Sequence, residues 1–286
     1  MKQHRITSSR INRSRGGNIA SLLMLILLGT FMLLPLIFVA SNAFKPLDEL
    51  FIYPPRLFVR HPTTDNFNDL MVIMAQSWVP FSRYVFNTLF LTAMGTLGHL
   101  LLTSMAAYAL ARHQFPGSRL IFSTIVLSLM FTPAVTGIPV YILISKLHLL
   151  DTYAAVLLPA MQYSLGLYLM KQFLETLPDS VMEAARIDGA GEIRIWWSVA
   201  MPMVKPAWLT LIILMIQSLW NIISPYTYSE ELKTMPQALQ QILTGGIART
   251  GVSAAVSLLI LSVPLITFIF SQSRIIETMN ASGIKE

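Results

Sequence analysis

Six long stretches of the chain contain no Lys, Arg, Asp or Glu, and short charged segments separate them. The stretches cover 16–44, 84–111, 120–145, 152–170, 206–229 and 250–273. Each has 19 residues or more, and about 20 apolar residues are needed for a helix to cross a hydrocarbon core of ~30 Å. The ten-residue alternation of a transmembrane barrel is absent. The pattern therefore predicts an all-α integral membrane protein with six transmembrane helices, since helices satisfy their own backbone groups in lipid.

The first stretch also raises the alternative of a secretory signal peptide, because basic residues precede it. A signal peptide has an apolar core of about 7–15 residues, whereas 16–44 has 29 and lacks a small-x-small cleavage site. We therefore expect a retained helix. The predicted domains are a cytoplasmic basic tail over 1–18, a transmembrane domain over 19–276 and a cytoplasmic tail over 277–286.

Two prolines interrupt the third predicted helix. Pro133 and Pro139 lie within 120–145, and a proline removes a backbone hydrogen bond and kinks a helix. The fourth predicted helix covers about 152–173.

Basic residues indicate the orientation of the helices, because they gather on the cytoplasmic side. With the N-terminus inside, 13 of the 20 Lys and Arg residues are cytoplasmic. Both termini and the segment between helices 4 and 5 are then predicted to be cytoplasmic.

Composition agrees with a membrane protein. The chain is 54% hydrophobic and only 12% charged, with a mean hydropathy of +0.61, whereas soluble proteins have about 25% charged residues. The net charge of +6 follows from the topology, and no basic face interleaved with aromatics indicates a nucleic-acid partner. The chain has no cysteine, which excludes disulfides, thiolate metal sites and thiol catalysis.

The segment 174–205 is unusual because it gathers charge in an otherwise apolar chain. It predicts two short helices joined at Gly189, since glycine favours the left-handed residue that ends a helix. Met182, Ala185 and Ile187 give the first helix an apolar side. An amphipathic loop lying on lipid is one interpretation, but such helices are rich in Lys and Arg. The acidic and small residues favour docking to a soluble protein.

The stretch "EAARIDGAGEIRIWWSVAMP" resembles the cytoplasmic EAA loop of binding-protein-dependent ABC importer permeases. The positions that match the pattern are Glu183, Ala184, Ala185, Asp188, Gly189, Ala190 and Pro202. "AAYALARHQFPG", "IPVYILISKLHLLDTYAAVLLP" and "WNIISPYTYSEELKTMPQAL" are similar to the carbohydrate, maltose-permease-like subfamily. The tail "ETMNASGIKE" and the absence of an acidic residue after "WN" depart from that pattern and leave the substrate open.

The resemblance implies a permease subunit that moves a sugar, in particular an oligosaccharide, into the cytoplasm by alternating access. Its EAA helix would dock in a cytoplasmic ATPase, so Glu183, Ala184, Ala185, Asp188 and Gly189 would be coupling residues. The chain is then not an enzyme, and it has no phosphate loop of the G-x-x-x-x-G-K-[ST] type. No metal or cofactor is expected in this chain, and ATP and Mg²⁺ would bind the partner ATPase subunits.

The implied partners are a second permease subunit, in particular a related heterodimer partner, two cytoplasmic ATPase subunits, an extracellular solute-binding protein, the sugar and the lipid bilayer. No nucleic acid is expected. The implied location is the bacterial cytoplasmic membrane, which the chain crosses several times.

Neutral polar residues near mid-membrane are the candidates for the substrate path. Counting from the helix ends selects His99, Thr132, Gln162 and Gln217, with Tyr163, Trp220 and Asn221 as weaker candidates. Each could instead make an interhelical hydrogen bond that only packs the helices.

Two alternative functions remain at this point. A self-sufficient secondary transporter would normally have intramembrane ionisable residues and inverted repeats, and this chain has neither beyond His99. An ABC importer permease for a non-sugar solute is the other alternative.

Overall fold

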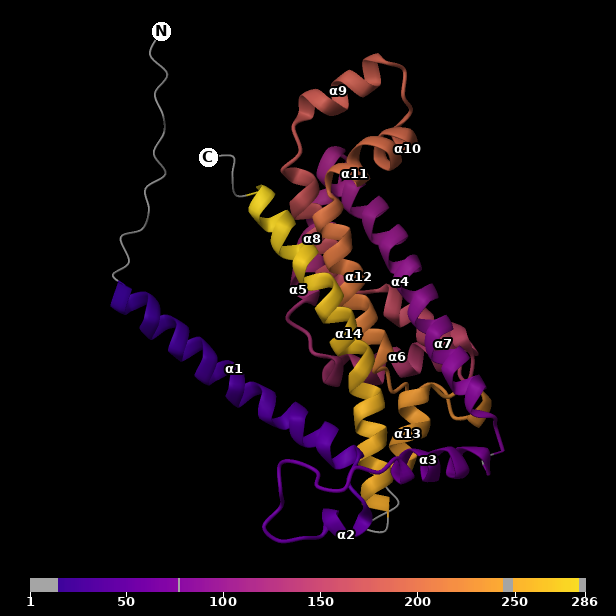
Figure 1. Cartoon of the computed structure of the whole chain (residues 1–286). Helices are drawn as coiled ribbons and strands as arrows, with labels where there is room; N and C mark the ends of the chain where they lie inside the picture. Colours follow the sequence, from indigo (N-terminus) through magenta and orange to yellow (C-terminus); the bar gives the residue numbers. More distant parts are fainter. Residues whose placement is uncertain (1–14, 77, 244–248, 283–286) are drawn as a thin grey trace.

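The computed structural model describes residues 15–76, 78–243 and 249–282, and the regular secondary structure in these ranges is helical. Figure 1 shows an elongated bundle from which α1 leans away and beyond which α9 projects. In chain order the α-helices are α1 (Arg15–Ala43), α2 (Leu47–Leu50), α3 (Asp65–Ala75), α4 (Phe81–Arg112), α5 (Ser118–Ser128), α6 (Pro133–Lys146), α7 (Tyr153–Met161), α8 (Ser164–Glu175), α9 (Asp179–Ile187), α10 (Glu192–Ile195), α11 (Met201–Met203), α12 (Lys205–Trp220), α13 (Met235–Leu243) and α14 (Thr250–Ser282).

Most of the predicted basic tail, residues 1–14, and the last four residues of the predicted C-terminal tail lie outside the described residues. Helix α1 begins at Arg15 and α14 continues to Ser282. Both helices therefore extend a few residues beyond the limits of 19 and 276 that the sequence predicts for the transmembrane domain.

Four helical stretches are long and apolar enough to cross a membrane, namely Gly16–Ala43, Phe81–Arg112, Tyr153–Glu175 and Thr250–Phe270. A fifth follows if Glu192–Met203 and Lys205–Trp220, which meet at a bend of 82°, form one span. The described residues thus form an all-helical membrane protein with four to five candidate spans, whereas the sequence predicts six.

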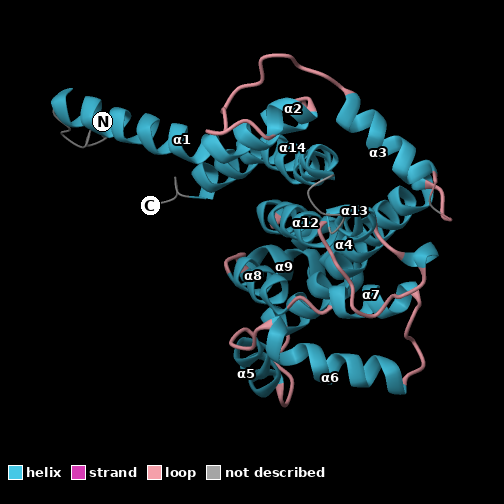
Figure 2. Cartoon of the chain, turned by 90° about the horizontal axis from the view of Figure 1, so that it is seen from below, coloured by secondary structure: helices cyan, strands magenta, loops and turns pink. Residues whose placement is uncertain are grey.

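The third predicted helix is absent from both counts, because it is divided into α5 and α6, and the fifth predicted helix is counted only if the bent pair forms one span. Thr132 is extended, with φ −80° and ψ 154°, since the ring of Pro133 disfavours helical geometry in the preceding residue. Helix α5 has 11 residues and a length of about 16 Å, roughly half of a hydrocarbon core. Figure 2, which looks along the bundle, shows α6 lying across it. The kink predicted at Pro133 is therefore a complete break, whereas Pro139 lies inside α6.

The fourth predicted helix also has a break, between α7 and α8. Gln162 and Tyr163 leave helical geometry, with ψ angles of 51° and 94°. Pro159 lies inside α7 and cannot donate a hydrogen bond to the preceding turn. The carbonyl oxygen of Met161 is instead bonded to His99 on α4, at 2.9 Å from Nδ1. A tertiary contact thus satisfies a backbone group next to the break.

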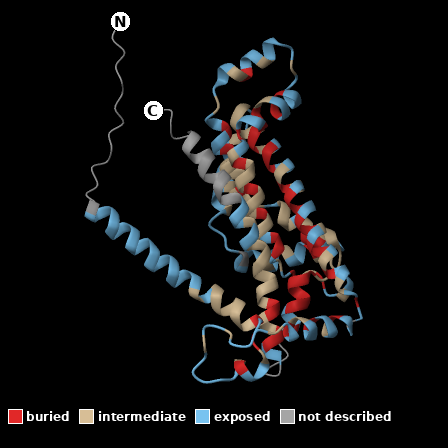
Figure 3. Cartoon of the chain, viewed as in Figure 1, coloured by how far each residue is buried: buried red, intermediate tan, exposed pale blue. Residues whose placement is uncertain are grey.

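Helix α4 is the centre of the bundle and contacts α8, α12 and α7. Two clusters of buried side chains lie at its two ends. One includes Met170, Leu174 and Ile195 near α9, and the other includes Tyr84 and Leu239 near α13. Figure 3 shows buried positions repeated along α4 and concentrated around α13. Helix α4 therefore links the core at one end of the molecule to the core at the other.

Helix α1 contributes little to this core. Its side chains from Leu22 to Leu28 are exposed, and it meets α14 at the end of the bundle that lies away from α9 (Figure 1). Exposed apolar side chains are stable against lipid, which is as apolar as they are.

Candidate functional site

Helix α9 projects beyond one end of the bundle (Figure 1). Asp179 is in its first turn and Arg186 in its last turn, and each charge opposes the partial charge of the helix end beside it. Gly189 then has φ +78°. The N–H of Ala190 donates to the carbonyl of Ala185 at 3.0 Å, and the N–H of Gly189 donates to that of Arg186 at 3.0 Å. These bonds form a Schellman motif, so the predicted glycine turn is confirmed.

The predicted coupling residues lie together around this turn. Glu183, Ala184, Asp188 and Gly189 are exposed, whereas Ala185 is half-buried and packs against the core cluster that contains Met182. Four of the five candidates thus face away from the bundle. The fifth belongs to the side that holds α9 in place.

Two exposed isoleucines flank the same turn, and sequence reasoning missed them. Ile187 is 86% exposed and Ile193 is 76% exposed. The prediction that Ile187 belongs to the apolar side of α9 with Met182 is therefore wrong, because both residues lie within α9 and a separation of five residues places them about 140° apart around a helix. These two side chains are the large apolar groups that the turn exposes beside the coupling candidates.

The chain returns to the bundle through α10, a π-helical stretch over Trp196–Ala200, α11 and the 82° bend into α12. Trp196 is buried in the core cluster, whereas Trp197 is 58% exposed. The second predicted helix of the segment is confirmed, with a wider turn in its middle.

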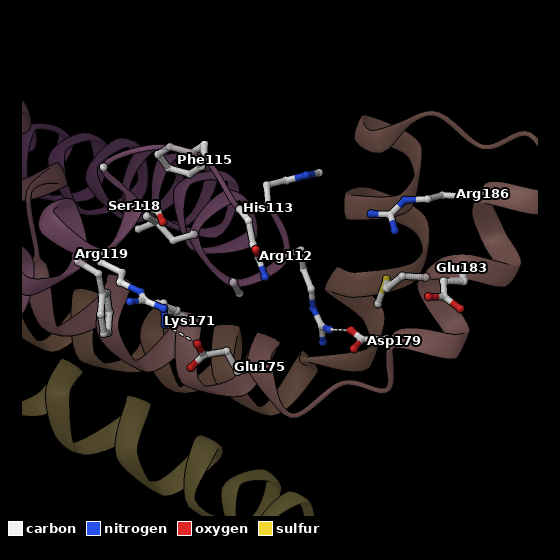
Figure 4. Close-up of a pocket in the computed structure, with 16 residues that line it drawn as sticks. Arg112, His113, Phe115, Ser118, Arg119, Lys171, Glu175, Asp179, Glu183 and Arg186 are labelled. Atoms are coloured by element: carbon white, nitrogen blue, oxygen red, sulfur yellow. Dashed lines mark hydrogen bonds and ion pairs between the residues drawn. The ribbon is translucent and has the colours of Figure 1, made fainter.

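A cavity of about 890 Å³ lies between α9 and the adjacent ends of α4, α5 and α8. Figure 4 shows Arg112 reaching from α4 toward Asp179, and Lys171 beside Glu175 on α8. These two pairs are ion pairs. Arg119 also lines the cavity and is exposed. The cavity wall is therefore charged but largely neutralised by its own pairs.

A second, smaller cavity of about 250 Å³ lies at the break between α7 and α8. We call it the polar niche, and its polar lining residues are Thr103, Thr124, Ser128, Gln162, Tyr163 and Ser164. The hydroxyl of Ser128 donates to that of Ser164 at 2.7 Å. The threonine and serine hydroxyls of the niche are hydrogen-bonded within the protein, so the surface that it exposes is mostly apolar, and no charged side chain is among its lining residues.

His99 lies behind the niche and is not part of its lining. Its side chain is fully buried, and Nδ1 donates to the Met161 carbonyl, since a carbonyl oxygen can only accept. A Cβ added to Gly166 would lie 2.2 Å from Nε2. The ring of His99 packs edge-on against Tyr163, with 5.7 Å between centroids. His99 therefore supports the broken helix.

The niche includes two of the seven candidates for the substrate path, Gln162 and Tyr163, whereas Trp220 is buried in the core cluster near α13. Thr132 is exposed just before α6. Gln217 is half-buried on α12, and its backbone carbonyl accepts from Nδ2 of the exposed Asn221 at 3.4 Å. These three do not line the niche.

Four niche residues, Thr103, Thr124, Ser128 and Ser164, were not selected from the sequence. The available signal was the four-residue spacing of Thr124 and Ser128, which places both hydroxyls on one face of an apolar helix.

Comparison with known proteins gives matches over most of the chain. Residues 99–279 match the family model described as "binding-protein-dependent transport system inner membrane component". The protein LplC of Bacillus subtilis is 30% identical over 204 residues, which are 71% of this chain and 67% of LplC. The arabinooligosaccharides transport system permease protein AraQ of Halalkalibacterium halodurans is 29% identical over 260 residues, 88% of this chain and 90% of AraQ.

A solved structure has the same fold. It is the crystal structure of a bacterial ABC transporter involved in the import of the acidic polysaccharide alginate, and one of its chains aligns with a TM-score of 0.78 at 23% identity. The alignment covers 92% of this chain and 99% of that chain. The helical arrangement in Figure 1 therefore also occurs in a transporter of known structure.

Proposed function

The chain belongs to the family of binding-protein-dependent transport system inner membrane components, and from this we propose that it moves a neutral oligosaccharide into the cytoplasm by alternating access. As a member of this family it is a multi-pass inner-membrane permease subunit of a bacterial ABC importer. It is not itself an enzyme, and the ATPase partners bind the ATP. The sugar, the topology and the residue roles are the proposed part.

In the proposed topology the chain crosses the membrane six times, with α5 and α6 together forming the third passage. The end of the bundle that bears α9 faces the cytoplasm, as do both termini. The excess of basic residues assigned to that side supports this orientation. The domain limits remain 19–276 for the transmembrane part, with the coupling loop over 174–205.

The projecting α9 is the single observation that carries the coupling role. We assign Glu183, Ala184, Ala185, Asp188 and Gly189 to contact with a cytoplasmic ATPase subunit, and add Ile187 as an apolar contact. Charge pairs at exposed sites contribute about 0–1 kcal/mol, whereas burying an isoleucine contributes about 2 kcal/mol. The isoleucine is therefore expected to contribute more affinity than any single charge.

The assembly we propose contains this subunit, a related second permease subunit, two ATPase subunits and an extracellular solute-binding protein. One six-passage subunit forms half of the pathway, and the polar niche would be part of its wall. The absence of a charged side chain among the lining residues of the niche supports a neutral cargo, and the similarity to AraQ supports an oligosaccharide.

Uptake by the reconstituted complex with its solute-binding protein tests this proposal. Three solutes are compared: the neutral sugar arabinotriose, and two acidic solutes, namely an alginate trisaccharide and sn-glycerol 3-phosphate. We expect ATP-dependent uptake of arabinotriose and little uptake of the two acidic solutes. Preferential uptake of an acidic solute would overturn the neutral-sugar assignment. Uptake driven by an ion gradient without ATP would overturn the ABC mechanism.

A further inference from the structure

The C-terminal end of α4 is hydrogen-bonded to both α9 and α10 of the coupling loop. Arg112, the last residue of α4, has a side chain only 7% exposed. Its Nη2 donates to the carbonyl oxygens of Leu174 and Leu177, the latter at 2.7 Å, and its Nη1 donates to Asp179. One guanidinium thus joins α4, the end of α8 and the start of α9.

These acceptors explain why an arginine is needed. The carbonyl of Leu174 is one of the last four of α8, which have no partner within the helix, and that of Leu177 lies in the turn that follows. A guanidinium has five N–H donors in a rigid fork, so it can reach two carbonyls and a carboxylate together. A lysine has the charge but not the fork.

A second connection lies one turn earlier on the same face of α4, because Tyr108 and Arg112 are four residues apart. The buried Tyr108 hydroxyl donates to Glu192 Oε2 at 2.9 Å. Glu192 Oε1 accepts from Arg186 Nε at 2.9 Å, so Glu192 also joins the start of α10 to the end of α9. His113 Nε2 lies 3.4 Å from the same carboxylate.

We infer that Arg112 is a positioning residue that makes α9 and α4 move as one body, assisted by Tyr108 and Glu192. The inference rests on the proposed coupling function, because the force on α9 comes from the ATPase. Helix α4 has 32 residues and also carries Thr103, about 13 Å from Arg112 along the helix. A displacement of α9 would then move the wall of the polar niche.

Spin labels on the assembled complex test this inference, and the absence of cysteine allows labels at chosen sites. One label replaces Ser180 on α9 and the other replaces Met105 on α4, both of which are exposed. The distance between them is measured without nucleotide and after trapping with ATP and vanadate. We expect one narrow distance that is equal in both states.

The variant Arg112→Gln should broaden this distribution, and Arg112→Lys should restore it in part. Arg119→Gln removes the same charge from an exposed position on the same cavity and should leave the distribution narrow. Tyr108→Phe removes one hydroxyl without changing shape, so it provides the decisive measurement if Arg112→Gln does not assemble. It should also broaden the distribution.

An unchanged narrow distribution in Arg112→Gln, or in Tyr108→Phe if it alone assembles, would overturn the inference. A distance that differs between the two nucleotide states of the otherwise unsubstituted complex would do the same. Failure of the proposed function is distinguishable, because the unsubstituted chain would then not co-purify with an ATPase subunit.

Discussion

Gly189 determines how α9 ends, and comparison with the nearby Gly191 allows the effect of backbone geometry to be separated from the effect of side-chain bulk. Gly189 has φ +78°, whereas Gly191 has φ −71°, and a Cβ added at either would meet no atom within 4 Å. Only Gly189 therefore needs the left-handed conformation, which costs an L-residue about 1–2 kcal/mol.

We predict that Gly189→Val uncouples ATP hydrolysis from solute uptake while the subunit still inserts and assembles. The strain tilts the turn and moves the exposed end of α9. The measurement is solute taken up per ATP hydrolysed by the reconstituted complex. Gly191→Val is the matched control and should retain coupling. Equal loss in both variants would instead indicate that bulk at the interface is responsible, and normal coupling in Gly189→Val would refute the role of the turn.

Asp151 holds the loop after α12 at the opposite end of the bundle. Its Oδ1 accepts from the N–H groups of Tyr228 and Ser229, each at 3.0 Å, and its Oδ2 accepts from the Ser229 hydroxyl. Burial raises the pKa of Asp151, but these hydrogen bonds outweigh it and hold the pKa below its ordinary value of 3.8. The ionised form is therefore the one that stabilises the loop.

The lowered pKa of Asp151 means that the folded loop favours the ionised carboxylate. The stabilisation is therefore fully present above pH 3.8, the ordinary pKa of the group, and is lost as the pH falls through the lower pKa of the folded state. We predict that acid releases this loop, which a fluorescent label on Tyr228→Cys would report. Asp151→Asn keeps an acceptor and tolerates the φ of 59° found here. It should lose the acid transition, and an unchanged transition would contradict the assignment to Asp151.

At the scale of helices, the sequence predicts most of what the structure contains. The charge-free stretches locate the spans, and Pro133 signals the division between α5 and α6. The break between α7 and α8 could not be predicted in the same way, because Gln162 and Tyr163 are not helix breakers. The Met161 carbonyl beside the break accepts a hydrogen bond from His99, which lies more than 60 residues earlier in the chain. A contact between residues so far apart cannot be predicted from the local sequence.

In the candidate sites, too, local features can be predicted from the sequence, whereas features that depend on packing between distant segments cannot. The glycine turn was predictable because Gly189 has a conformational reason to be there. The outward position of Ile187 was predictable too, because a separation of five residues from Met182 places the two about 140° apart around a helix. The niche hydroxyls come from three helices, so only their packing brings Thr103, Ser128 and Ser164 together.

The loop that includes α9 and α10 should bind its partner mainly through its two exposed isoleucines. We predict that Ile187→Ser with Ile193→Ser weakens the association with the ATPase subunit by about a hundredfold or more, since each isoleucine loses about 2 kcal/mol of apolar burial. The measurement is the dissociation constant of the detergent-solubilised subunits. Ile223→Ser, at an exposed position on the opposite end, is the control and should bind normally. Unweakened binding by the double variant would assign the contact to other residues.

The topology of the whole molecule can be tested at its two ends, because the chain has no cysteine of its own. Ser180 is exposed on α9, and Tyr228 is 72% exposed at the far end of the bundle. With α9 in the cytoplasm, a membrane-impermeant maleimide added to intact spheroplasts should label Tyr228→Cys at once. It should label Ser180→Cys only after the membrane is permeabilised. The reverse order would invert the proposed orientation, and labelling of both in intact cells would show that the two ends do not lie on opposite sides of the membrane. The expected order follows from basic residues favouring the inner face, which also places α9 where an ATP-hydrolysing partner can reach it.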